Sequence, residues 1–172
     1  MNKLFAACAV VLLTACQSIA PQEPLRATAA LQPTQGNKAF GEATFEEVDG
    51  KVRVIVFTQG LGPDREHGLH IHEAGDCSSG DGMSAKGHFN PLGKPHGAPA
   101  NAERHAGDLP ALKAGKDGRA RLDTTVDIIT VRPGPASIVG RGLIIHADPD
   151  DYKTQPTGNA GARIACGVIK PG

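Results

Sequence analysis

Short segments in which apolar and polar residues alternate recur along the chain from residue 26 to residue 169. The segment 119–127 is the clearest case, because its even-numbered positions are apolar or Thr and its odd-numbered positions are charged or Thr. A period of two places successive side chains on opposite faces of a β-strand. This pattern and the turn residues around it predict strands over 26–31, 38–47, 51–58, 69–72, 109–114, 119–127, 142–147 and 162–169.

The residues between these segments suit tight turns. Asp49-Gly50 separates 38–47 from 51–58, and Lys116-Asp117-Gly118 precedes 119–127. Such sequences join antiparallel strands. No segment has the length and period of an ordinary helix. Short strands joined by turns predict an all-β fold, an antiparallel β-sandwich or β-barrel of about eight strands.

Two stretches interrupt the strand pattern. Residues 74–109 are rich in Gly, Pro, Asn, Ser and His, and residues 148–161 also lack strand character. A loop as long as the first is uncommon in a compact domain unless it is functional or held by internal ties, such as those that a bound metal supplies. We therefore expect the functional site in this loop.

The length and net charge of the chain limit the kinds of molecule that it is expected to bind. A chain of 172 residues is long enough for one domain with a hydrophobic core. Its 18 basic and 18 acidic residues give a net charge of +0, which removes the electrostatic argument for nucleic acid or for a polybasic membrane contact. A small partner is expected.

Residues 1–15 predict a signal peptide. Lys3 provides a positive charge, and the apolar run that follows is too short to span a bilayer. The run ends in Leu13-Thr14-Ala15-Cys16, which resembles the lipobox of bacterial lipoproteins, where the chain is cut before the Cys and its thiol is lipidated. The alternative is an ordinary signal peptide with an incidental Cys16.

A lipobox implies a membrane contact through the lipid alone. Residues 16–25 carry two prolines and no periodicity, so they read as a lipidated tether to a domain over 26–172. The expected location is the periplasm, anchored to the cell envelope. Gln17 in place of Asp after the lipidated Cys favours the outer membrane.

The chain has 4 cysteines, of which Cys8 lies in the signal peptide and Cys16 is the lipidation site. The remaining pair, Cys77 and Cys166, belongs to an exported domain, which favours a disulfide. The alternative is a pair of free thiols that act as soft metal ligands.

All 7 histidines lie between His67 and His146. His70 and His72 leave the same face of the strand 69–72, whereas His67 points to the opposite face and is expected to be a buried hydrogen-bonding residue. The long loop supplies three imidazoles and a carboxylate that suit tetrahedral Zn²⁺: His88, His96, His105 and Asp108. An N₄ site for Cu²⁺ would need one more imidazole besides His70, His72 and His146. Either one histidine serves both sites or one site lacks a ligand; spacing leaves both alternatives open.

Four motifs resemble the copper/zinc superoxide dismutase family, and the resemblance covers about residues 27–169. The two signatures are His67-Gly68-Leu69-His70-Ile71-His72-Glu73 and Gly158-Asn159-Ala160-Gly161-Ala162-Arg163-Ile164-Ala165-Cys166-Gly167-Val168-Ile169. Between them lie Gly87-His88-Phe89-Asn90-Pro91-Leu92 and Glu103-Arg104-His105-Ala106-Gly107-Asp108-Leu109. The resemblance implies an eight-stranded Greek-key β-barrel with long metal-binding loops.

The resemblance also implies the role of each site residue. Copper would be bound by His70, His72, His88 and His146. Zinc would be bound by His88, His96, His105 and Asp108, with His88 bridging the two metals. Asp150 matches the carboxylate that links one copper-bound and one zinc-bound imidazole, and Arg163 matches the arginine that guides the anion. Cys77 and Cys166 match the family's disulfide.

The implied reaction is disproportionation of superoxide anion to oxygen and hydrogen peroxide, which would protect the cell envelope. His88 and Arg163 would be its catalytic residues.

A copper-binding or copper-delivery lipoprotein without turnover is the alternative. Cu⁺ carriers favour Cys and Met ligands, however, and the mature chain offers only Met83 and one Cys pair. A zinc hydrolase is disfavoured, because a closed His₃Asp site has no open position. Quaternary arrangement varies in the family, so a homodimer stays open.

Overall fold

The computed structural model describes residues 24–172, so the predicted signal peptide (1–15), Cys16 and the tether up to residue 23 lie outside the described residues. Within 24–172 the only helical element is a 3₁₀ turn, η1 (Met83–Ala85). The strands are β1 (Leu25–Pro33), β2 (Phe40–Val48), β3 (Lys51–Gln59), β4 (Glu66–His67), β5 (Leu69–His72), β6 (Leu112–Lys113), β7 (Ala120–Val126), β8 (Gly142–His146), β9 (Arg163–Val168) and β10 (Lys170–Pro171). The all-β prediction is confirmed.

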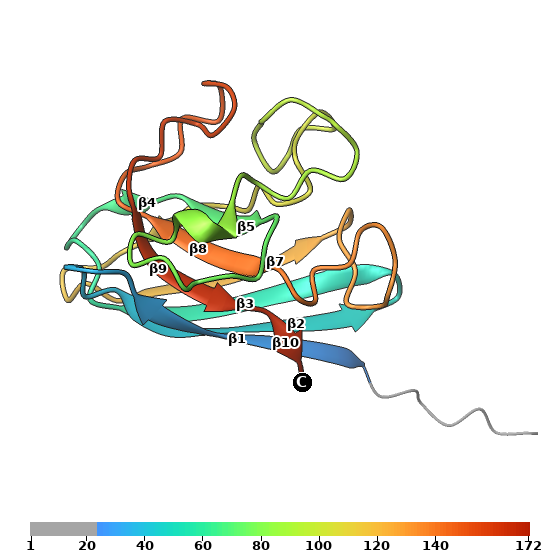
Figure 1. Cartoon of the computed structure of the whole chain (residues 1–172), viewed down its shortest axis with the longest axis horizontal. Helices are drawn as coiled ribbons and strands as arrows, with labels where there is room; N and C mark the ends of the chain where they lie inside the picture. The colour runs from blue at the N-terminus through green and yellow to red at the C-terminus, as the bar shows by residue number, and fades with distance from the viewer. Residues whose placement is uncertain (1–23) are drawn as a thin grey trace, which may run out of the picture.

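Eight strands form one antiparallel sheet in the order β5-β8-β9-β1-β2-β3-β7, with β10 paired to β1. β1 pairs with β2 from Leu25 to Leu31 and with β9 at Gln32 and Pro33. This strand therefore passes from one half of the sheet to the other. The sheet curls into two facing layers, with β1, β2 and β3 below and β5, β8 and β9 above (Figure 1).

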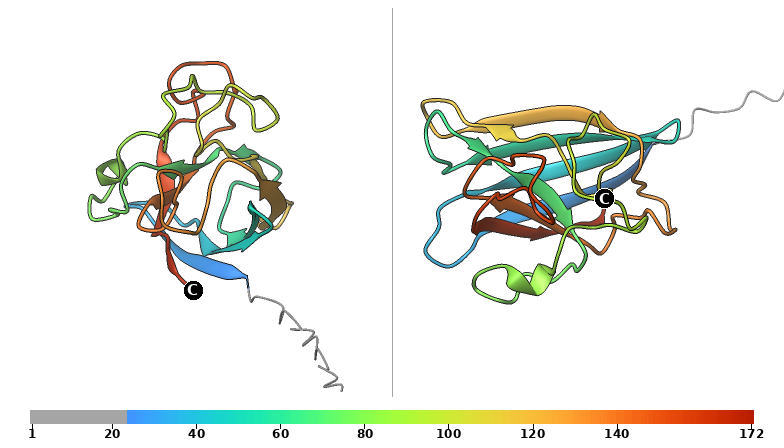
Figure 2. Two further views of the ribbon diagram at one scale, coloured as in Figure 1. Left: turned by 90° about the vertical axis from the view of Figure 1, so that its right-hand side faces the viewer. Right: turned by 90° about the horizontal axis from the view of Figure 1, so that it is seen from above.

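A second, two-stranded sheet bridges the opening between β5 and β7. β4 pairs with β6 through His67 and Leu112. Beside this pair the N–H of Leu109 donates to the carbonyl of Leu69 at 3.3 Å. The predicted strand 109–114 is reduced to Leu112–Lys113, since Pro110 has no N–H to donate to a ladder. Seen end-on, the strands curl around into a barrel-like shape (Figure 2).

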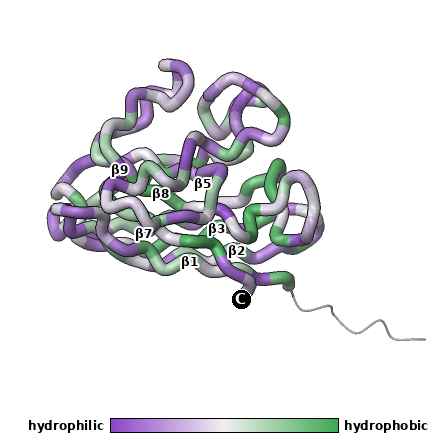
Figure 3. Tube along the Cα trace, viewed as in Figure 1, coloured by the Kyte–Doolittle hydropathy of each residue, from purple (hydrophilic) through white to green (hydrophobic). Residues whose placement is uncertain are grey.

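The hairpin of β2 and β3 follows the predicted pattern closely. Asp49 and Gly50 have φ values of 51° and 74°, as a type I′ turn requires. Every second residue of β3, Val52, Val54 and Val56, has 0% exposure. Hydrophobic positions gather along the strands in Figure 3, so the core lies between the two layers and consists mainly of aliphatic side chains.

The two predicted strandless regions form loops on the same side of the molecule. Residues 73–111 contain only η1 as a regular element, and residues 147–162 contain none. Both loops rise above β5 and β8 in Figure 1. Among the described residues, no helix has the length and apolar character needed to cross a membrane.

Candidate metal centre

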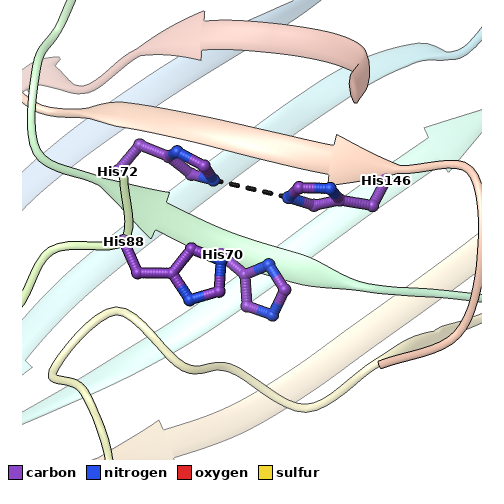
Figure 4. A group of neighbouring side chains, drawn as sticks. All are labelled: His70, His72, His88 and His146. Atoms are coloured by element: carbon purple, nitrogen blue, oxygen red, sulfur yellow. Dashed lines mark hydrogen bonds between the residues drawn. The ribbon is translucent and has the colours of Figure 1, made fainter. Parts of the chain in front are cut away.

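Four buried imidazoles meet beside β5 and β8. His70 and His72 come from β5, His146 is the last residue of β8, and His88 comes from the 73–111 loop. One ligand atom from each lies within 4.8 Å of the others. Figure 4 shows the four rings turned toward one another. We call this set, His70, His72, His88 and His146, the copper group.

The pairing of β5 with β8 positions His70, His72 and His146 relative to one another. β5 pairs with β8 in a register that places Leu69 opposite Ile145 and His72 opposite Gly142. The N–H of His146 then donates to the carbonyl of Gly68 at 2.9 Å. All residues of β5 are buried, because one face packs in the core and the other carries the two histidines under the loops.

In three rings of the copper group, one nitrogen already has a protein acceptor. The Nδ1–H of His72 donates to the carbonyl of Lys86 at 2.8 Å, and that of His146 to the carbonyl of Gly161 at 3.2 Å. Nε2–H of His70 donates to Asp150 Oδ2 at 2.6 Å. These bonds select the tautomer of each ring and leave the other nitrogen as a lone pair.

The remaining nitrogens of the four rings lie close together. His72 Nε2 and His146 Nε2 lie 3.4 Å apart (dashed line in Figure 4), and with both Nδ1 protons engaged elsewhere they face each other as two lone pairs. His70 Nδ1 and His88 Nε2 are buried with no hydrogen-bond partner. Four such nitrogens fit a Cu²⁺ ion, which prefers imidazole ligands in tetragonal geometry.

A second group surrounds the carboxylate of Asp108. Its Oδ1 lies 2.9 Å from His88 Nδ1, 3.1 Å from His96 Nδ1 and 3.3 Å from His105 Nδ1. The other oxygen, Oδ2, accepts the main-chain N–H of Gly97 at 3.1 Å and of His105 at 2.9 Å. Three nitrogens and one oxygen fit tetrahedral Zn²⁺. We call this set, His88, His96, His105 and Asp108, the zinc group.

His88 belongs to both groups, which decides between the two alternatives left open by the spacing. Its Nδ1 faces Asp108, while its Nε2 has no protein partner. Its ring stacks on that of His70 at 3.9 Å between centroids. One imidazole can thus serve both sites, and neither group lacks a ligand.

Asp150 connects the groups through the nitrogens that face away from the proposed metals. Its Oδ2 accepts from His70, and its Oδ1 lies 2.9 Å from His96 Nε2. Gly158 makes room for this carboxylate: its φ is +66°, and a Cβ there would lie 1.8 Å from Asp150 Oδ1. Only glycine suits this position on both grounds.

Burial and neighbouring carboxylates shift the pKa values of these histidines in different directions. Burial lowers the pKa of His88 to about 4 and that of His146 to about 3, so both rings are neutral near pH 7. Burial also opposes a charge on His96, but hydrogen bonds to Asp108 and Asp150 outweigh it and raise the pKa of His96 to about 9. His88 and His146 thus offer neutral nitrogens, whereas the two carboxylates favour positive charge on His96.

Comparison with known proteins decides the family. The family model for copper/zinc superoxide dismutase matches residues 39–169. The chain belongs to the copper/zinc superoxide dismutase family.

Named relatives agree with this assignment, and a solved structure shares the fold. The chain is 41% identical over 152 residues to "Superoxide dismutase [Cu-Zn] 2" of Aquifex aeolicus (strain VF5), covering 86% of this chain and 88% of the relative. It is 39% identical over 166 residues to "Superoxide dismutase [Cu-Zn]" of Paramecium bursaria Chlorella virus 1, covering 93% and 87%. The solved structure titled "Crystal Structure Analysis of the clock protein EA4" aligns with a TM-score of 0.77 and 42% identity, over 87% of this chain and 96% of that one.

In this member of the dismutase family, Arg163 lies at the mouth of the copper group. It is the register partner of His146 in the pairing of β8 with β9. Its guanidinium donates to the carbonyls of Gly82, at 2.7 Å, and Lys86. Burial lowers its pKa, yet a guanidinium remains a cation in proteins. Among the described residues, no carboxylate lies within 4.0 Å of this charge.

A small pocket of about 250 Å³ gives access to this cation. Arg163, His72 and His146 line it together with Met83. The pocket is therefore the place where an anion can reach the copper group and a positive charge at once.

The predicted disulfide between Cys77 and Cys166 is confirmed. It joins the loop that carries η1 to β9, and its Cys166 packs with Ala85 and Ile144. The same loop supplies the two carbonyls that accept from Arg163, so the bridge ties this loop to the strand that carries Arg163.

The prediction for His67 is also confirmed. It is buried on β4, outside both groups, and its Nδ1 lies 2.8 Å from the carbonyl of His146. Sequence reasoning missed the acceptors that fix the copper-group rings, the carbonyls of Lys86 and Gly161, because a main-chain acceptor carries no residue-type signal.

Proposed function

We propose that this chain disproportionates superoxide, converting two superoxide anions and two protons into oxygen and hydrogen peroxide. The copper group would hold copper and the zinc group zinc. One observation carries the proposal: His88 presents one nitrogen to each group, and the remaining ligands of both groups are present and buried. Family membership supports the same activity.

The chain's own residues would bind the substrate and move a proton. Copper, when bound, supplies the one-electron exchange, taking an electron from one superoxide and giving it to the next. Arg163 would attract and orient the anion in the 250 Å³ pocket, a volume that accommodates a small anion. Nε2 of His88 can hold a proton and deliver it to the reduced product.

The zinc group would have a structural role. Its three nitrogens and one carboxylate oxygen would supply all four ligands of a tetrahedral zinc ion, which would leave no position open for a water nucleophile. This closure argues against a zinc hydrolase. Zinc would hold His88 at Nδ1 and so fix the orientation of Nε2 toward the copper group.

The ligand types support copper delivery without turnover less well than they support the dismutase reaction. A Cu⁺ carrier favours sulfur ligands. Within residues 24–172 the cysteines are joined in a disulfide, and neither ligand group contains sulfur.

The decisive experiment measures superoxide consumption by the purified chain loaded with copper and zinc. His146→Ala should abolish the activity, because it removes a nitrogen of the copper group only. The variant should still bind one zinc, which shows that the fold survives. Full activity in His146→Ala, or none in the loaded wild-type chain, would refute the dismutase proposal.

The cellular placement is a separate proposal that rests on the sequence. Residues 1–15 would be removed and Cys16 lipidated. The residues between Cys16 and the start of β1 at Leu25 would link the lipid to the domain in the periplasm, at the outer membrane. Labelling cells with a radioactive fatty acid should mark the wild-type chain but not Cys16→Ser. A homodimer predicts about twice the monomer mass for the purified domain in sedimentation.

A further inference from the structure

Gln155 lies in the 147–162 loop and belongs to neither ligand group, but its side-chain amide hydrogen-bonds to the main chain of His96, a residue of the zinc group. The N–H of His96 donates to Gln155 Oε1 at 2.8 Å, and Gln155 Nε2 donates to the carbonyl of His96 at 2.9 Å. The main-chain donor and acceptor dictate which way the amide points. The two bonds imitate one hydrogen-bonded pair of an antiparallel ladder.

His96 stands where the chain has no regular structure of its own. Residues 90–104 contain neither strand nor helix. In the part of the chain that the structure describes, the main-chain N–H and carbonyl of His96 have no hydrogen-bond partner besides Gln155. Asp150, from the same loop as Gln155, holds the His96 ring at Nε2. The 147–162 loop thus fixes both the backbone and the ring of His96.

The turn that presents Gln155 is held by its own hydrogen bonds. Asp151 Oδ1 accepts the N–H groups of Lys153, at 2.9 Å, and Thr154, at 2.8 Å, and its Oδ2 accepts the Thr154 hydroxyl at 2.6 Å. The N–H of Gly158 donates to the carbonyl of Thr154 at 2.7 Å. Gln155 is therefore presented to His96 by a compact turn.

We propose that Gln155 is a positioning residue of the zinc group. By holding the main chain of His96 it keeps Nδ1 beside Asp108 before the metal arrives, so less ordering remains to be done on binding. Groups that orient a metal ligand typically change metal affinity by about 10- to 100-fold when they are lost. The inference rests on the proposed function, since it requires zinc at this group.

The test replaces Gln155 by Met, which has a similar volume and cannot make either bond. Zinc and copper affinities of the metal-free domain are measured by competition with chelators. In Gln155→Met we expect zinc to bind about 10-fold more weakly and copper to change by less than about twofold, because His96 contributes only to the zinc group. Gln59→Met, at the end of β3, is the matched control and should leave both affinities unchanged.

The outcomes separate this inference from the proposed function. Tight zinc binding by wild type together with an unchanged zinc affinity in Gln155→Met overturns the role of Gln155 alone. Equal weakening of zinc and copper in the variant also overturns it, because general loosening would act on both groups. A wild-type chain that binds no zinc would overturn the zinc group itself.

Discussion

At the scale of single residues, the hydrogen bond on one ring nitrogen decides what the other nitrogen can bind. His72 and His146 use Nδ1 for carbonyls and offer Nε2, whereas His70 uses Nε2 for Asp150 and offers Nδ1. These hydrogen bonds orient each ring and raise its basicity as a ligand. Asp150 contacts one ring of each group, His70 and His96.

Asp150→Asn should weaken zinc binding by about 10- to 100-fold and leave the fold intact. An amide offers only one acceptor oxygen where the carboxylate serves His70 and His96, and its NH₂ faces the second ring as a donor. Chelator competition measures the loss. Asp148→Asn, in the same loop but half-exposed and paired with Arg65, is the control and should bind zinc like wild type.

Residue-scale prediction from sequence succeeds where residue type carries the information. The imidazoles and Asp108 can be found because few side chains bind metals, and the structure brings them together as the spacing and the resemblance suggested. Gln155 could not be found in this way. It is a largely exposed amide whose partner is the main chain of a residue 59 positions away, and no periodicity or motif encodes such a contact.

At the scale of elements, a buried carboxylate anchors the connection after β7. Glu47, near the end of β2, is 4% exposed. Its Oε2 accepts the N–H groups of Val131 and Arg132 at 2.7 and 2.9 Å, and its Oε1 accepts Arg132 Nε at 2.9 Å. Burial alone would raise the pKa of Glu47, but these hydrogen bonds outweigh it and lower the pKa.

Glu47→Gln should therefore destabilise the metal-free domain by about 1–3 kcal/mol at pH 7, since its NH₂ would face a donor in either orientation, the Arg132 guanidinium or the two main-chain N–H groups. The folded-state pKa lies below that of the unfolded chain, so the stabilisation is complete above the unfolded value and is lost as pH falls through the folded value. Urea unfolding at several pH values measures this. The wild-type advantage should shrink on acidification; an advantage that persists or grows at acid pH would contradict the assignment.

The neighbouring Glu46→Gln serves as the control for this prediction. Glu46 pairs with Arg26, which is 56% exposed, at 3.0 Å. Exposed ion pairs contribute about 0–1 kcal/mol, so this variant should unfold nearly like wild type at every pH.

Element-scale prediction depends on whether local sequence alone specifies pairing. The β2–β3 hairpin is specified locally by Asp49-Gly50 and by the alternation in 51–58, and the ends of both strands were predicted to within two residues. β4, β6 and β10 contain two residues each. A pattern of period two cannot be recognised over two residues, and these strands exist only because distant partners lie beside them.

At the scale of the whole molecule, the two ligand groups join parts of the chain that the sheet leaves apart. The copper group connects β5, β8 and the 73–111 loop, and the zinc group gathers three further positions of that loop around His88. Asp150 then ties the 147–162 loop to both. Metal binding and the ordering of these loops are therefore coupled, because an unfolded chain cannot offer the same ligands together.

Removing both metals should lower the unfolding temperature of the domain by about 16–32 °C. Each metal present at about 1,000 times its dissociation constant stabilises the folded state by about 4 kcal/mol, so two metals contribute about 8 kcal/mol, and a domain of this size loses about 2–4 °C per kcal/mol. Calorimetry at fixed metal concentration measures the shift.

Zinc alone should restore a large part of this shift in wild type, because the zinc group joins four positions of the 73–111 loop. It should restore none in His105→Ala, which lacks one of the four zinc ligands. Equal unfolding temperatures for the metal-free and reloaded wild-type domain would show that the loops are ordered by the protein alone and that the coupling is absent.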